Sequence, residues 1–181
     1  MNIFVMRHGT TVWNEKGITQ GRTNNRLSQD GKKLVEDVAK QYKDEKFDVI
    51  VCSPLTRTVQ TANIMNKYHK TKTIRDDCLL EIDQGIFTGR KWKSLTDEEK
   101  KLKKERAKQT GMESYDEAFE RAEQFIKRIK TNYDKYNSIL VVTHNIIASF
   151  IEDIIQNKTK DFEDASFVKS FSNAQVKHFV I

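Results

Sequence analysis

Short runs of apolar residues, each ended by polar or charged side chains, punctuate the chain. Residues 2–6, 48–52 and 138–142 are runs of this kind, too short to sustain a helix, so each predicts a buried strand. Residues 73–75 predict a weaker strand, and residues 175–181 predict a last strand at an edge of the sheet. The pattern therefore indicates five strands.

Between these runs, apolar residues recur at intervals of three and four, which is the period of one helical face. One such helix starts after Ser28, and another follows Ser114, which forms a capping box with Glu117. Thr96 precedes three acidic residues and predicts a shorter helix, and residues 146–155 form an apolar helix.

A further helix start is indicated by Ser53 and Pro54. Serine is a preferred N-cap residue, and proline is favoured at the first helical position. We therefore expect a helix to begin at Pro54 and to carry Arg57 in its first turn. The segment after Glu81, marked by Gly85 and Gly89, is expected to be a loop.

Strands that alternate with helices predict an α/β fold, with a mostly parallel central sheet and helices on both faces. The length of 181 residues suits a single domain spanning residues 1–181. In open sheets of this class, ligands bind beyond the carboxyl ends of the strands. Three of the predicted ends carry the polar sequences Arg7-His8, Ser53 to Arg57 and Thr143-His144, which we expect to converge.

Composition narrows the classes of function. The formal charge is +6, and residues 83–111 alone hold nine Lys/Arg against five Asp/Glu, so much of the excess is local. Aromatic residues are not interleaved with this basic run as they are in a stacking platform, so a nucleic-acid partner is not expected.

The first apolar stretch stops at Arg7, so we expect no signal peptide, no membrane association and a cytoplasmic location. Cys52 and Cys78 are expected to be buried, reduced thiols.

The candidate residues favour phosphate chemistry. The chain has no His-Glu-x-x-His or His-x-His motif and no glycine-rich nucleotide loop, so we expect no metal and no cofactor. Planar guanidinium groups bind phosphate oxygens in pairs, and a neutral imidazole can attack phosphorus. Arginines and histidines at strand ends could therefore form an anion site.

Several motifs occur in one order along the chain, and together they resemble the histidine phosphatase superfamily, also called phosphoglycerate mutase-like. They are Met6-Arg7-His8-Gly9-Thr10-Thr11-x-x-Asn14, Gln20-Gly21-Arg22 with Leu27 and Gly31, Ser53-Pro54-Leu55-x-Arg57-x-x-Gln60-Thr61-Ala62, Leu80-Glu81 with Gly85 and Gly89, and Val141-Val142-Thr143-His144.

This resemblance implies a phosphoglycerate mutase-like fold and a role for each matching residue. His8 would be the phosphorylated nucleophile, and Glu81 would be the general acid and base. The transferring phosphoryl group would be surrounded by Arg7, Arg57 and His144, with Asn14 as a neutral donor. Gln20 and Gly21 would border the pocket through backbone contacts.

Two departures from the family pattern bear on the site. Asn145 follows His144 where the family commonly has glycine; it could lie at the phosphate site, although we favour a role as cap of the following helix. Asn24 and Arg26 stand where an acidic residue and proline are frequent. Neither departure removes a catalytic group.

The resemblance implies hydrolysis of a small phosphorylated metabolite. Family mutases carry extra chain after the acid/base glutamate, whereas only 62 residues separate Glu81 from His144 here. A shorter cover would admit water to phosphorylated His8, so we favour a phosphatase over a mutase that depends on 2,3-bisphosphoglycerate. A catalytically weak phosphate-binding or interaction module is a third reading. Residues 83–111 are expected to cover the pocket, with Arg90, Lys91, Trp92 and Lys93 as candidate substrate contacts.

Overall fold

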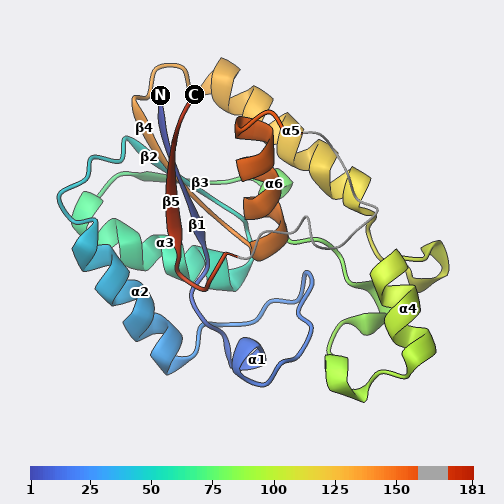
Figure 1. Ribbon diagram of the computed structural model, residues 1–181. Helices are drawn as coiled ribbons and strands as arrows, with labels where there is room; N and C mark the ends of the chain where they lie inside the picture. The colour runs from blue at the N-terminus through green and yellow to red at the C-terminus, as the bar shows by residue number, and fades with distance from the viewer. Residues whose placement is uncertain (159–170) are drawn as a thin grey trace.

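The computed structural model describes residues 1–158 and 171–181. Its centre is a sheet of five strands in the order β3-β2-β4-β1-β5 (Figure 1). β1, β2, β3 and β4 run parallel, and β5 pairs antiparallel with β1 at the edge. The strands span Asn2–Arg7 (β1), Val49–Cys52 (β2), Lys72–Arg75 (β3), Ser138–Thr143 (β4) and Val176–Val180 (β5). The predicted mostly parallel α/β sheet is confirmed.

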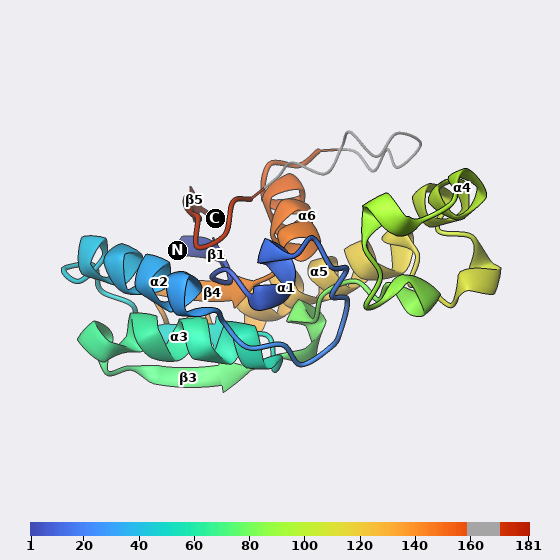
Figure 2. The ribbon, with the colours of Figure 1, turned by 90° about the horizontal axis from the view of Figure 1, so that it is seen from below.

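Helices cover both faces of this sheet. α2 and α3 pack together beside one face, and α5 and α6 pack together beside the other. α4 lies away from the sheet, at the side of the molecule (Figure 2). The helices span Val12–Glu15 (α1), Gln29–Gln41 (α2), Thr56–His69 (α3), Asp97–Glu105 (α4), Tyr115–Asn132 (α5) and Asn145–Ile155 (α6).

The two-residue repeat of the strands divides the core into two layers. Successive side chains of a strand point to opposite faces, so Ile3 and Val5 join the cluster under α5 and α6. Phe4 and Met6 join the cluster under α2 and α3. All of these apolar strand positions are buried because both faces are covered, as is usual for parallel sheets.

The packing of α2 beside the loop after β1 requires Gly31. A Cβ atom at this position would lie 1.9 Å from the carbonyl oxygen of Thr10, which no side chain could occupy. The Ser28 hydroxyl caps the same helix by accepting from the Gly31 N–H at 3.0 Å. The family glycine thus allows α2 to approach the turn that follows His8.

Most of the predicted helix starts are confirmed, and one is wrong. Thr96 and Ser114 form capping boxes at the starts of α4 and α5. However, α3 begins at Thr56 and not at Pro54, because Leu55 still has an extended backbone. Its first N–H is capped from a distant loop, since Thr56 N donates to Asn24 Oδ1 at 3.0 Å. Arg57 lies in the first turn, as expected.

Between β3 and α5, the chain consists of α4 and short 3₁₀ turns joined by loops. Three-residue 3₁₀ turns occur at Asp77–Leu79, Gly85–Phe87, Trp92–Ser94 and Lys108–Thr110.

Both cysteines are buried and free, and burial raises the pKa of Cys52 to about 11. None of the helices in the described part of the chain combines the length and hydrophobicity needed to cross a bilayer.

Candidate active site

The carboxyl ends of β1 and β4 lie side by side and carry two buried histidines. Arg7 is paired with Thr143 in the register of these strands, so the next residues, His8 and His144, also become neighbours. Their ring centroids are 5.2 Å apart, and the next residue, Gly9, is held by its N–H, which donates to Thr61 Oγ1 at 3.1 Å. The carboxyl ends of β1 and β4 therefore converge, as the sequence predicted.

Arg57 joins the two histidines. Its Nε lies 3.2 Å from His8 Nε2 and 3.2 Å from His144 Nδ1, so one N–H is shared between two imidazoles. Its Nη1 donates to the carbonyl of Thr23 at 2.7 Å, and its Nη2 donates to that of Gly21 at 2.8 Å. The side chain is 1% exposed, and burial lowers the pKa of Arg57 to about 10. Each Nη nitrogen retains one further N–H that can donate to an anion.

These contacts determine which nitrogens of the histidines carry protons. His8 Nδ1 lies 2.7 Å from the Gly9 carbonyl, which only accepts, so Nδ1 carries the proton and Nε2 keeps its lone pair. His144 Nδ1 accepts from Arg57, so His144 Nε2 carries the proton and donates to Ser53 Oγ at 2.9 Å. The lone pair of His8 Nε2 therefore faces the guanidinium group and accepts its shared N–H.

Both imidazoles are held neutral. The pKa of His8 is well below its ordinary value of 6.5 because the ring is buried and Arg57 lies beside it. The pKa of His144 is also well below 6.5, again through burial first and Arg57 second. A neutral imidazole with an available nitrogen lone pair is a nucleophile.

Arg7 supplies a second guanidinium. Its Nη1 donates to the Phe171 carbonyl at 2.6 Å, whereas its buried Nε has no hydrogen-bond partner in the described part of the chain. Burial lowers the pKa of Arg7, and the nearby Glu81 opposes that effect. An unpaired buried donor is costly unless a ligand satisfies it, so this N–H is a candidate phosphate contact.

Glu81 faces the two arginines from the loop after the 3₁₀ turn at residues 77–79. Its Oε1 accepts from the Ile82 N–H at 3.0 Å. Burial raises the pKa of Glu81, and this effect is opposed by the Ile82 N–H, Arg57 and Arg7. A carboxyl group with a raised pKa can both give and take a proton near neutral pH.

The other predicted site residues line the loop next to the histidines. Asn14 Oδ1 accepts from the Thr11 hydroxyl at 2.9 Å within the capping box of α1. The same hydroxyl lies 2.9 Å from Gln20 Oε1, so its single proton is shared between the two side-chain oxygens. Gly21 adopts a left-handed backbone conformation, with φ of 49°, and its carbonyl holds Arg57. The expected backbone contact is therefore present for Gly21, whereas Gln20 contacts Thr11 through its side chain.

Asn145 does not cap α6, so that interpretation was wrong. His144 is the N-cap residue and makes no side-chain cap bond. Asn145 is the first helical residue, and its Oδ1 accepts from the Phe171 N–H at 2.9 Å. Since the Phe171 carbonyl binds Arg7, Asn145 is connected to the site through one residue.

Sequence reasoning missed several residues that hold these groups. Ser53 binds His144, and Asn173 Nδ2 donates to the His8 carbonyl at 3.1 Å. Phe171 and Asn173 lie between α6 and β5, in a stretch of sequence without periodicity, so no sequence signal marked them. Ser53 lies within a family motif, but its position at a strand end indicated a helix cap instead.

The basic segment 83–111 lies beside the loop of α1. Ile18 forms an antiparallel bridge with Lys91, and Lys103 Nζ donates to Thr19 Oγ1 at 2.7 Å. Arg90, a candidate substrate contact, is engaged by Glu99 through two hydrogen bonds of 2.5 and 3.0 Å. Segment 83–111 therefore lies next to residues 18 and 19, which precede Gln20. Arg90 itself is paired with Glu99.

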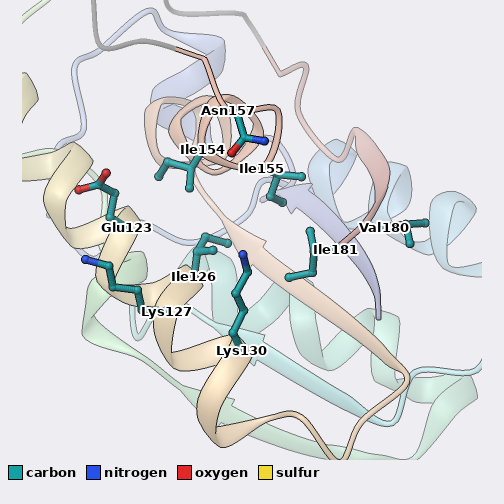
Figure 3. Close-up of a pocket in the computed structure, with 9 residues that line it drawn as sticks. All are labelled: Glu123, Ile126, Lys127, Lys130, Ile154, Ile155, Asn157, Val180 and Ile181. Atoms are coloured by element: carbon teal, nitrogen blue, oxygen red, sulfur yellow. The ribbon is translucent and has the colours of Figure 1, made fainter.

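A separate cavity of about 380 Å³ lies at the other end of α6 (Figure 3). Ile154 and Ile155 border it from the last turn of α6 and Asn157 from just beyond that helix, together with Lys127 and Lys130 of α5. His144 precedes the first turn of that helix, and β5, which also reaches the cavity, is antiparallel to β1. This cavity is therefore at the amino ends of the parallel strands, opposite the histidines.

A sequence profile of the histidine phosphatase superfamily (branch 1) matches residues 3–179. Among curated proteins, a probable phosphoglycerate mutase GpmB of Yersinia enterocolitica is 33% identical over 105 residues, which are 58% of this chain and 49% of that protein. Phosphoserine phosphatase 1 of Hydrogenobacter thermophilus is 35% identical over 89 residues, or 49% of this chain and 42% of that protein. The matched regions thus span about half the length of these relatives.

Solved structures show the same fold. The alpha-ribazole phosphatase of Shigella flexneri superposes with a TM-score of 0.80 at 24% identity, covering 88% of this chain and 81% of that one. A phosphoglycerate mutase of Bacillus anthracis superposes with a TM-score of 0.79 at 23% identity, covering 98% and 86%. The expected phosphoglycerate mutase-like fold is confirmed.

Proposed function

This chain belongs to the histidine phosphatase superfamily, and from that premise we propose that it hydrolyses a small phosphorylated metabolite through a phosphohistidine on His8. The observation that carries the proposal is the lone pair of His8 Nε2, which faces Arg57 Nε at 3.2 Å while Nδ1 is engaged by Gly9. The nucleophilic nitrogen of His8 and the anion-binding guanidinium of Arg57 therefore lie next to each other.

In the first step, His8 Nε2 attacks phosphorus, the N–P bond forms and the bond to the ester oxygen breaks. The shared N–H of Arg57 moves from the histidines to a phosphoryl oxygen, and Arg7 Nε binds another. A phosphoryl-transfer transition state spreads negative charge over these oxygens, so two positioned guanidiniums stabilise it without a metal ion. Glu81 gives its proton to the leaving oxygen.

His144 enters this step as an acceptor that becomes a donor. In the unliganded site its Nδ1 has no proton. A phosphomonoester that binds as the monoanion can give its proton to Nδ1, because the resulting imidazolium and phosphate dianion stabilise each other in a buried site. Protonated Nδ1 then donates to the phosphoryl oxygen while Nε2 still donates to Ser53. The proton leaves again with the inorganic phosphate released at the end.

In the second step, water attacks phosphorylated His8. Glu81, now a carboxylate, takes a proton from the water, the N–P bond breaks, and inorganic phosphate leaves with His8 regenerated. The relatives include both phosphatases and phosphoglycerate mutases, so transfer to a second substrate is the alternative fate of the phosphohistidine. The short interval between Glu81 and His144 favours water.

The test traps the intermediate. Brief incubation with a ³²P-labelled substrate and an alkaline quench should leave label on the protein that is lost in acid, because a phosphoramidate is acid-labile. His8→Ala should abolish the label, whereas His69→Ala, at a histidine far from the site, should retain it. Label that persists in His8→Ala would reject the mechanism. A screen of phosphorylated metabolites, including a 3-phosphoglycerate mutase assay with and without 2,3-bisphosphoglycerate, then separates hydrolysis from transfer and from simple binding.

A further inference from the structure

The carboxylate of Glu113 accepts three hydrogen bonds and forms an ion pair with Arg22. Arg121 of α5 binds it with two bonds, from Nε to Oε1 at 2.7 Å and from Nη2 to Oε2 at 2.9 Å. Arg22 Nη2 lies 3.0 Å from Oε1, and the Asp83 N–H donates to Oε2 at 3.1 Å. The Glu113 side chain is only 10% exposed, so these charges meet with little solvent screening.

The same partners hold the backbone on both sides of Glu81. Arg121 Nη1 donates to the carbonyls of Cys78 and Leu80 at 2.9 and 3.0 Å. Arg22 Nε donates to the carbonyl of Glu81 itself at 3.1 Å. Residues 78–83 are therefore tied to α5 and to the loop around residue 22, and both ties meet at Glu113.

This network also reaches the phosphate-binding arginine. Arg22 stands between Gly21 and Thr23, whose carbonyls bind the two Nη nitrogens of Arg57. The backbone that orients Arg57 and the backbone that carries Glu81 are thus linked through the side chain of Arg22. The distance between the proton donor and the phosphoryl group depends on this link.

We infer that Glu113 is a positioning residue for the general acid: it holds Arg22 and Arg121 in the orientation that places Glu81 against the leaving oxygen. The inference rests on the proposed role of Glu81. The hydrogen bond to the Glu81 carboxylate comes from the adjacent Ile82 N–H, so the carboxylate moves with its own backbone. A displacement of about 1 Å in a reacting group can cost on the order of 100-fold in rate.

The test measures single-turnover phosphorylation of His8 by an alkyl phosphate and by p-nitrophenyl phosphate. An alkoxide leaves poorly and needs the acid, whereas p-nitrophenolate needs little help. Glu113→Gln should slow the alkyl reaction by about 10- to 100-fold, as for other residues that orient a catalytic group, and change the aryl rate by less than about 3-fold. Misfolding would lower both rates in proportion and would leave their ratio unchanged.

Two further variants keep the test decisive. Arg22→Gln removes the contact to the Glu81 carbonyl from a side chain that is 37% exposed, so it should fold and should move the ratio in the same direction. Asp48→Asn is the matched control, since the Asp48 carboxylate accepts from the N–H groups of Asn137 and Ser138 at 2.7 and 3.0 Å, at the amino ends of the strands and away from Glu81. It should lower the melting temperature and leave the ratio unchanged.

The outcomes distinguish this inference from the proposed function. Glu81→Gln should lower the alkyl rate alone. If it does so, while Glu113→Gln and Arg22→Gln leave the ratio unchanged, the positioning role is overturned and the acid role stands. If Glu81→Gln itself leaves the ratio unchanged, the acid role falls and the positioning role falls with it.

Discussion

The unliganded protein loses some stability because His8 and His144 are buried beside arginines. His8 is 2% exposed and His144 is fully buried, and both share the N–H of Arg57. Burial disfavours the imidazolium form, and the neighbouring guanidinium disfavours it further. The arrangement that keeps His8 nucleophilic therefore also makes the folded state sensitive to protons.

We predict that the free energy of unfolding falls as the pH is lowered below about 6.5. The unfolded chain binds protons at His8 and His144 near their ordinary pKa of 6.5, while the folded pKa of each lies well below that value. Stability then falls with pH by up to roughly 1.4 kcal/mol per unit for each histidine. The raised pKa of Glu81 acts in the opposite sense and reduces the slope.

Urea unfolding between pH 5 and 8 at constant ionic strength measures this effect. His8→Asn removes one of the protons taken up on unfolding, so its slope should be smaller than that of the parent. The double variant with His144→Asn should have the smallest slope, which comes from His69, whose pKa is also lowered by burial. Equal slopes in all three proteins would contradict the prediction.

Single residues also show where sequence reasoning stops. The hydrophobic runs placed His8 and His144 correctly just after strands, and the helix signal placed Arg57 correctly in the first turn of α3, because these features follow from local sequence. They could not show that Asn24 caps a helix 32 residues away or that Asn145 binds Phe171. Both asparagines bond to distant backbone groups, and such partners depend on the tertiary fold.

At the level of elements, predictions held where periodicity or capping was local. The strands and α2, α4, α5 and α6 lie within a few residues of their predicted bounds. α3 starts later than expected because Leu55 keeps an extended backbone, and the expected cap residue, Ser53, binds His144 as well as the Leu55 N–H. The α1 helix has four residues, too few for a periodic signal, and the 3₁₀ turns after β3 are shorter still. Whether residues 83–111 select the substrate stays a prediction.

A pair of lysines on α4 tests that prediction. Lys103 is partly buried, donates to Thr19 and lies over the rings of Phe87 and Trp92 at 5.5 and 5.8 Å. Lys104 is an exposed neighbour on the same helix. Lys103→Met keeps the length of the side chain and removes its charge. It should change the relative kcat/KM among phosphorylated metabolites by about 10-fold or more, since a charge-assisted contact contributes about 1.5–3 kcal/mol.

The control for this experiment is Lys104→Met, which should leave every rate within about 2-fold of the parent because an exposed charge contributes little. Hydrolysis of p-nitrophenyl phosphate should be nearly the same in all three proteins, since this substrate has no second group to bind. Equal losses on every substrate in Lys103→Met would assign the lysine a purely structural role.

For the whole molecule, the order of strands decides how residues far apart in sequence meet. β4 lies between β2 and β1, so Ser53, His144 and His8 follow three adjacent strands. The sequence indicated a parallel sheet and a shared edge, but it did not contain the strand order. The strand order depends on which face of the sheet each helix packs against, and that depends on the packing of the whole core. One anion bound at this edge would therefore join loops from both halves of the chain.

We predict that inorganic phosphate stabilises the protein through this edge and needs no divalent ion. A ligand at 100 times its Kd adds about 2.7 kcal/mol to the unfolding free energy, which corresponds to roughly 5–10 °C in Tm for a chain of this size. Thermal unfolding in the presence of EDTA, with and without phosphate, measures the shift. Arg57→Met removes the four guanidinium hydrogen bonds that shape the site and should abolish the shift, whereas Arg26→Met, at an exposed arginine in the preceding loop, should retain it. If Arg57→Met does not fold, Arg7→Gln tests the same point, because its buried Nε has no other partner among the described residues. A shift that requires Mg²⁺ or another added cation would overturn metal-free binding, and a shift that survives in the variants at Arg57 and Arg7 would place the phosphate elsewhere.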